Sequence, residues 1–340
     1  MDKRDLLFDR EFVVLLLSRF IGYGMVITTI SFLLNNYLNY WRDWPGLASF
    51  FTHYQLFEAD QSAPISAESL TLAHVQFGLY VVPLLCLALF LIKTPHQNLK
   101  SDADFLSGLC SYFIRASFWS VLLIGIFDLI ISFMRLEETL ALVFGDKLAE
   151  DLGRSQFRGE MVHYPLIAVS FIIACFSRSL GFTWLSLLIV IAEIQIVIAR
   201  FVFSYEQAFM ADLVRFWYGA LFLFASAYTL LEEGHVRVDI LYSGFNDEAK
   251  AWTNSLGALF LGIPLCWIIL VLGMSGKFSV INGPLLTFEI TQQGYGLFVK
   301  YWLAVFLMIF AVSMMIQFAS QFLKSVWTLT KPPDENNTSA

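Results

Sequence analysis

Ionisable residues inside long apolar stretches are the first candidates for chemistry in this chain. A charge at the centre of a lipid bilayer costs about 2.5–3.5 kcal/mol, so each one needs a partner or a function. We take seven polar residues in or beside such stretches as candidates: Asp128, Glu193, Arg200, Asp212 and Arg215, with the uncharged Gln195 and His163. We expect them to form interhelical contacts, ion pairs or the path of a transported ion.

Arg200 and Asp212 stand near the facing ends of two apolar stretches that a short turn, 204–207, connects. An ion pair across this turn would lower the cost of burying both charges. We expect this pair to form, and it has two possible roles. It can fix the hairpin, or it can help to dock a partner protein.

Glu193 is deeper in its apolar stretch and has few polar neighbours. Arg200 lies two helical turns away, about 10.5 Å along the axis, too far for direct contact. Glu193 can form an interhelical hydrogen bond, remain protonated and silent, or couple transport to protons or ions. Asp128 allows the same alternatives, and we interpret it as a polar contact between helices.

The sequence shows only weak evidence for a cofactor motif and none for a catalytic one. Membrane cytochromes bind haem through pairs of helix-borne histidines, and here His74 and His163 alone lie near apolar stretches. The sequence contains no nucleophile and base constellation, glycine-rich phosphate loop or carboxylate-rich metal motif. We predict no catalytic residue, no metal site and no cofactor of the chain's own.

A polar hairpin, 232–240, is the most distinctive hydrophilic segment. Gly234 permits a break after the preceding helix. The next residues alternate between aliphatic and polar, so an extended strand would have one charged face that carries Arg237 and Asp239. The segment is either an ordered connector, held by contacts of Arg237, Asp239 or His235, or a docking element.

Composition explains why most of the chain should lie in lipid. Hydrophobic residues make up 58% and charged residues 14%, and the mean hydropathy is +0.67. A soluble globule cannot bury this much apolar surface. The net charge of -7 comes largely from loops and the tail, and no basic stripe indicates a nucleic-acid partner. We predict an all-α polytopic membrane protein.

Seven apolar stretches are long enough to span a bilayer, which takes about 20 residues. They are 12–37, 70–92, 112–134, 182–203, 209–231, 252–274 and 296–327. An eighth, 161–176, is short enough to be either a span or an interfacial helix. A weak excess of lysine and arginine on one side favours eight spans with both termini inside. We divide the chain into an N-terminal membrane extension, 1–160, a second membrane part, 161–330, and a disordered tail, 331–340.

Several elements in the second part resemble the small membrane subunit of tripartite ATP-independent periplasmic (TRAP) transporters, the DctQ-like permease. The family has an arginine and an aromatic residue at one helix end, an acidic residue opening the next helix, and a glycine-histidine motif that ends in aspartate. Here they correspond to Arg200-Phe201, to Asp212, and to the run from Gly234 and His235 to Asp239. The resemblance covers about 177–326, and 1–160 is an extension unlike the usual small subunit.

The resemblance implies a scaffold in a sodium-gradient-driven uptake system of the bacterial inner membrane. Its partners would be a large DctM-like membrane subunit, which carries the substrate and sodium sites, and a periplasmic binding protein. Both ends of its four-helix unit would face the cytoplasm. The alternatives are the membrane anchor of a haem or quinone oxidoreductase and an independent secondary transporter.

Overall fold

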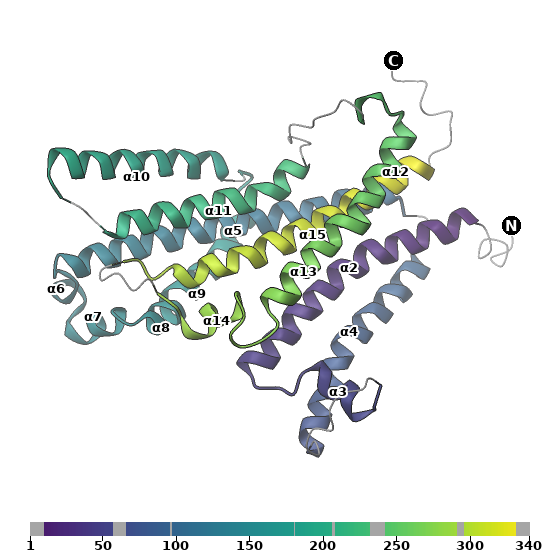
Figure 1. Cartoon of the computed structure of the whole chain (residues 1–340), viewed down its shortest axis with the longest axis horizontal. Coiled ribbons are helices and arrows are strands. Elements are labelled where there is room, and N and C mark those ends of the chain that lie inside the picture. The colour runs from purple at the N-terminus through teal and green to yellow at the C-terminus, as the bar shows by residue number, and fades with distance from the viewer. Residues whose placement is uncertain are drawn as a thin grey trace. The chain divides into compact units, whose positions relative to one another are not determined.

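The computed structural model describes residues 10–56, 66–95, 97–179, 181–205, 208–231, 242–290 and 296–330 (Figure 1). Every regular element within these ranges is a helix, and none is a strand. The predicted all-α fold class is confirmed.

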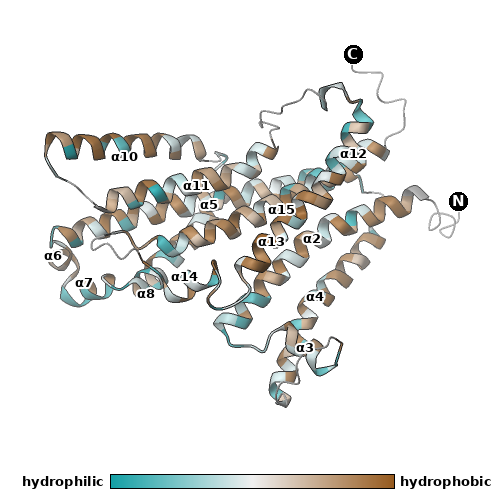
Figure 2. Cartoon of the chain, viewed as in Figure 1, coloured by the Kyte–Doolittle hydropathy of each residue, from teal (hydrophilic) through white to brown (hydrophobic). Residues whose placement is uncertain are grey.

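Eight segments of the described chain are helices long and apolar enough to cross a membrane. They are α2 (Arg10–Trp41), α4 (Ala67–Lys93), α5 (Leu99–Leu136), the joined α8 and α9 (Ser155–Arg158 and Tyr164–Phe176), α10 (Phe182–Val202), α11 (Ala208–Leu231), the joined α12 and α13 (Asp247–Gly257 and Ile263–Gly273) and α15 (Lys300–Thr330). Figure 2 shows apolar residues along most of α10 and α13. The chain is therefore an integral membrane protein, as its composition predicted.

Shorter helices connect these spans. They are α3 (Leu47–His53), α6 (Leu140–Phe144), α7 (Asp146–Leu152), α14 (Asn282–Thr287), and a 3₁₀ turn at Tyr242–Gly244. One π-helical turn, Gly159–His163, joins α8 to α9, and another, Ala258–Gly262, joins α12 to α13. In a π turn the backbone hydrogen bonds span five residues instead of four, and the helix continues through it.

The segment 161–176, uncertain from sequence, belongs to a continuous helical stretch of 22 residues, Ser155–Phe176. At 1.5 Å per residue, it is about 33 Å long and can cross the hydrocarbon core. The sequence underestimated its length because its first turns contain polar residues such as Arg158. The structure buries Arg158 completely, so its charge does not end the span.

The chain folds as two compact units. The first consists of residues 1–107, 236–266 and 315–340. In it α2 packs along α4, and Ser31 Oγ donates a hydrogen bond of 2.8 Å to the carbonyl of Leu79. The buried Gln76 side chain accepts from the Gly46 amide and donates to Asn35, which ties the end of α2 and its loop to α4.

The second unit consists of residues 108–235 and 267–314. Here α10 and α11 lie side by side (Figure 1). Gly125 of α5 allows close packing, because a Cβ there would lie 2.4 Å from Nε1 of Trp217 on α11. Aromatic rings of α11 and α15 fill the centre, where Phe306 lies 5.2 Å from Phe216 and 5.0 Å from Phe224 between ring centroids. This packing positions the buried polar site of the unit.

Candidate functional site

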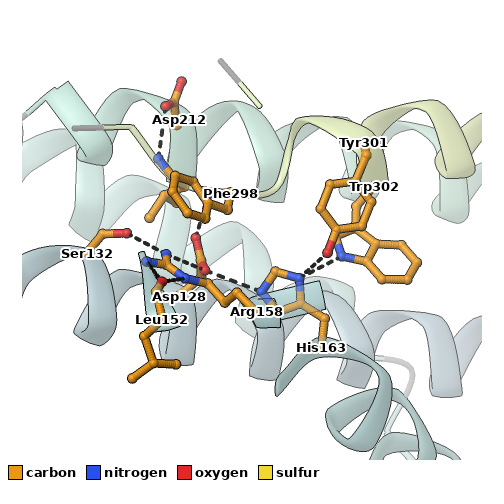
Figure 3. A network of polar contacts seen from close by, with 10 residues as sticks. Asp128, Ser132, Leu152, Arg158, His163, Asp212, Phe298, Tyr301 and Trp302 are labelled. Carbon is orange, nitrogen blue, oxygen red and sulfur yellow. Dashed lines mark hydrogen bonds and ion pairs between the residues drawn. The ribbon is translucent and has the colours of Figure 1, made fainter. Parts of the chain in front are cut away.

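A buried polar network lies in the second unit, where α5 approaches its end and where α9 and α15 begin. Figure 3 shows its residues pointing toward one another, together with Asp212 of α11. Asp128 and Ser132 come from α5, and residues 297–302 precede and open α15. Arg158 directly precedes the π turn before α9, and His163 is the last residue of that turn. The network therefore connects segments more than 100 residues apart.

Asp128 is its centre. One carboxylate oxygen, Oδ1, accepts from Arg158 Nη1 at 2.8 Å and from His163 Nε2 at 3.3 Å. The other, Oδ2, accepts from the backbone amide of Phe298 at 2.7 Å. The side chains of Asp128, Arg158 and His163 have no solvent-exposed surface. Both oxygens of this buried carboxylate thus have donors, which a buried ion pair needs to offset its desolvation.

All three guanidinium nitrogens of Arg158 donate hydrogen bonds. Nε and Nη2 donate to the carbonyl of Leu152 at 3.0 and 2.8 Å, and Nη1 also donates to Ser132 Oγ at 3.1 Å. The ring of Phe298 covers its face, with the guanidinium carbon 4.0 Å from the ring centroid. Arginine suits this position because its planar fork serves several acceptors at once.

The partners of His163 determine its protonation state. Its Nδ1 faces the indole Nε1 of Trp302 at 3.0 Å and the hydroxyl of Tyr301 at 2.5 Å. An indole N–H can only donate, so Nδ1 must be the acceptor and carry no proton. We therefore assign a neutral imidazole with its proton on Nε2, directed at Asp128. The network then contains one negative and one positive charge, Asp128 and Arg158.

The π turn sets the spacing of Arg158 and His163. Five residues of a regular α-helix correspond to about 140° of rotation, which would separate the two side chains around the axis. The wider winding of a π turn reduces this angle. Gly159, at the start of the turn, meets the ring of Phe288, because a Cβ would lie 2.3 Å from one of its carbons and 3.0 Å from the Tyr301 hydroxyl.

This network holds α5, the start of α9 and the start of α15 together. Its charges balance, its oxygens and nitrogens have partners, and its members are fully or almost fully buried. Such closed networks hold helices in one arrangement, since losing Asp128 or Arg158 leaves the other charge buried without its counter-ion. Asp128 was predicted as a polar contact between helices, and its hydrogen bonds agree with that interpretation.

The predicted Arg200–Asp212 ion pair is wrong: the structure contains no such contact between these two described residues. Arg200 is exposed on α10. Asp212 instead accepts from the amide of Leu297 at 3.2 Å, and Arg215 Nη1 lies 3.8 Å from its carboxylate. The physical reason is that the buried amides before α15 require acceptors. Asp212 and Asp128 supply them at Leu297 and Phe298, two successive residues.

Glu193 and Gln195 are exposed on α10, and neither forms a hydrogen bond with another described residue. An interhelical hydrogen bond, one of the alternatives for Glu193, is therefore absent among the described residues. The remaining predicted residues, Gly234, His235, Arg237 and Asp239, lie outside the described residues, so their roles stay predictions.

Sequence reasoning missed the partners of Asp128, which are 30 and 35 residues away. It also missed a second buried pair, in the first unit. There Arg19 Nε donates to Asp102 Oδ2 at 2.6 Å, and Tyr23 donates to Oδ1 at 2.9 Å. Arg19 also donates to the carbonyl of Thr94, at 2.6 Å. The one sequence signal was an arginine inside an apolar stretch.

Both histidines considered for haem have occupied ring nitrogens. His74 Nδ1 lies 2.7 Å from the carbonyl of Leu70, and its Nε2 lies 2.8 Å from the hydroxyl of Tyr54. His163 contacts Asp128 and the two aromatic residues described above. No cluster of three or more histidine, cysteine or acidic residues among the described positions could hold a metal ion.

Fold and site together define an α-helical integral membrane protein. Two ion pairs among its described residues, Arg19–Asp102 and Arg158–Asp128, are buried inside the protein. Residues 187–328 match the family model described as "Tripartite ATP-independent periplasmic transporters, DctQ component". This match, whose residues are called the DctQ region below, confirms the resemblance seen in the sequence motifs. No curated protein and no solved structure matches the chain.

Proposed function

We propose that the chain is the small membrane subunit of a TRAP-type, sodium-gradient-driven uptake system. It would work as a scaffold beside a large permease subunit, which carries the substrate and sodium sites, and a periplasmic binding protein. We place it in the bacterial inner membrane with both termini in the cytoplasm. An even number of spans puts the termini on the same side, and the weak excess of lysine and arginine on that side favours the cytoplasm.

The observation that carries this proposal is the match to the DctQ family over 187–328. The matched residues run from the first turns of α10 to the last turn of α15 and include four of the candidate membrane spans.

A scaffold must resist the movement of its partner, and the buried network supports this role. It joins Asp128 of the N-terminal extension to Phe298, Tyr301 and Trp302 of the DctQ region. Residues 108–160 of the extension would then be a fixed part of the scaffold. Membrane helices have little hydrophobic drive to associate with one another, so packing and sparse polar contacts of this kind determine their arrangement.

We propose α10 as the face on which the large subunit docks. This helix buries only 11% of its most apolar window within the chain. Glu193 and Arg200 lie two turns apart on roughly the same side of it, and both are exposed. A carboxylate facing lipid is costly, whereas a second membrane protein can provide it with a hydrogen-bond donor.

Affinity purification of the tagged full-length chain from its native membranes tests the proposal. We expect a large polytopic permease to co-purify and Glu193→Leu to lower its recovery. The same variant should leave the isolated chain as stable as the wild type, because Glu193 has no partner within the described chain. Leu272→Ala is a control, since Leu272 is exposed on α13, a different helix. Recovery of no permease would refute the subunit assignment. Undiminished recovery with Glu193→Leu would refute α10 as the docking face.

A further inference from the structure

An apolar groove of about 340 Å³ opens in the second unit beside the start of α10. Its walls are Phe118, Trp119 and Leu122 of α5 and Trp184, Leu185 and Leu188 of α10. Both helices are candidate membrane spans, so the groove runs along surfaces that face the hydrocarbon region. A hydrocarbon chain is the ligand that such walls suit.

One end of the groove lies at a membrane interface. Linker residues 177–179 and Gly181 lie between two spans, α9 and α10, and must therefore be near the membrane surface. Gly181 in this linker has a φ of +85°, which favours glycine, and a Cβ there would lie 3.3 Å from Cβ of Phe118. This contact puts Phe118 at the level of the linker. Arg115, three residues earlier on α5, lies about 4.5 Å further along the axis.

Two arginines stand at this end. Arg115 is on the same face of α5 as Trp119 and Leu122, at spacings of four and seven residues. It is half-buried, and its buried Nε has no hydrogen-bond partner within the described chain. Arg178 is exposed and immediately precedes Ser179, which lines the groove. A buried guanidinium nitrogen without an acceptor indicates that one is supplied from outside the chain.

We propose that this groove binds an anionic phospholipid, with an acyl chain between α5 and α10 and the phosphate beside Arg115 and Arg178. The acyl chain would contact the six apolar residues of the walls. The phosphate would accept from Arg115 Nε, and its negative charge would attract both arginines, as basic pockets between membrane helices do for anionic headgroups. This inference rests on the membrane location of the chain and is independent of the transporter assignment.

Lipid retention by the purified full-length chain provides the test. The protein is exchanged into detergent with equal amounts of phosphatidylglycerol and phosphatidylcholine, washed, and analysed by mass spectrometry for bound lipid. We expect the wild type to retain phosphatidylglycerol preferentially. Arg115→Gln and Arg178→Gln should each weaken this retention about fivefold, which corresponds to about 1 kcal/mol per arginine. Leu188→Trp, which fills the groove, should reduce the retention of phosphatidylglycerol at least as strongly.

Arg154→Gln is the matched control, because Arg154 is also exposed and pairs with Asp151 away from the groove. It should retain as much phosphatidylglycerol as the wild type. Equal retention of the two lipids by the wild type would overturn the proposal. So would unchanged retention by Arg178→Gln, whose exposed side chain makes misfolding no explanation, or by Leu188→Trp. If Arg115→Gln does not fold, Arg178→Gln and Leu188→Trp decide the result.

Discussion

Replacing Arg158 by methionine should destabilise the protein strongly, because the change leaves a carboxylate buried without its counter-ion. Asp128 would keep two donors, the amide of Phe298 at 2.7 Å and His163 Nε2 at 3.3 Å. Both are neutral, and neither balances the charge. Breaking one partner out of a buried pair typically costs about 3–5 kcal/mol. The carbonyl of Leu152 would also lose both of the hydrogen bonds that Arg158 donates to it.

A second substitution distinguishes the ion pair from simple loss of packing. Asp128→Asn keeps the size of the side chain but removes its charge, so the double variant Asp128→Asn/Arg158→Met buries no net charge. We expect it to be more stable than Arg158→Met alone, with a coupling free energy of about 2–3 kcal/mol between the two positions. A pair that contributed only shape would give additive effects.

The assay is equilibrium unfolding of the purified chain in mixed micelles by a denaturing detergent, followed by far-ultraviolet circular dichroism. Arg154→Met is the control. Its side chain is 65% exposed and pairs with Asp151 in a solvent-facing turn, so the loss should not exceed about 1 kcal/mol. A stabilising ion pair between Asp128 and Arg158 is refuted if Arg158→Met lowers the free energy of unfolding no more than this control does. It is also refuted if the double-mutant cycle gives no coupling free energy between the two positions.

Three further substitutions test other parts of the structure by the same unfolding assay. Gly159→Ala should cost about 1–3 kcal/mol, because its Cβ would lie 2.3 Å from a phenylalanine ring carbon. Gly108→Ala, with open space around it, should be neutral or stabilising, and equal effects at the two glycines would contradict the close approach. Arg19→Met should cost about 3–5 kcal/mol by stranding Asp102, and a loss below 1 kcal/mol would mean that this carboxylate is compensated otherwise. Trp302→Phe removes one donor from the imidazole of His163, which keeps the hydroxyl of Tyr301 as a second, so the free energy of unfolding should fall by about 0.6 kcal/mol. A loss above about 2 kcal/mol would refute the minor role assigned to Trp302.

The membrane spans were predictable because hydropathy averages over about 20 residues and needs no knowledge of neighbours. The exception was the span Ser155–Phe176, whose beginning was predicted too late. A window over its first turns includes Arg158 and Glu160, and hydropathy counts both as exposed charges. Only the tertiary contact with Asp128 makes Arg158 compatible with a buried position.

The site was less predictable, because its contacts are long-range. Asp128 itself is conspicuous as a carboxylate in an apolar stretch, but nothing in the spacing identifies Arg158 or His163 as its partners. The Arg200–Asp212 prediction failed for a related reason. It relied on proximity along the chain, whereas Asp212 accepts from a backbone amide 85 residues away, at Leu297. Backbone donors have no signature in a sequence, although each one that is buried needs an acceptor.

Solute uptake by proteoliposomes tests the central claim most directly. The vesicles would contain this chain and the co-purifying permease, separately or together, with the periplasmic binding protein outside, an inward sodium gradient, and the solute recovered from that binding protein. The account predicts sodium-dependent accumulation when all three proteins are present, and none with this chain alone. Accumulation by this chain alone, or undiminished accumulation without it, would contradict its assignment as a scaffold subunit.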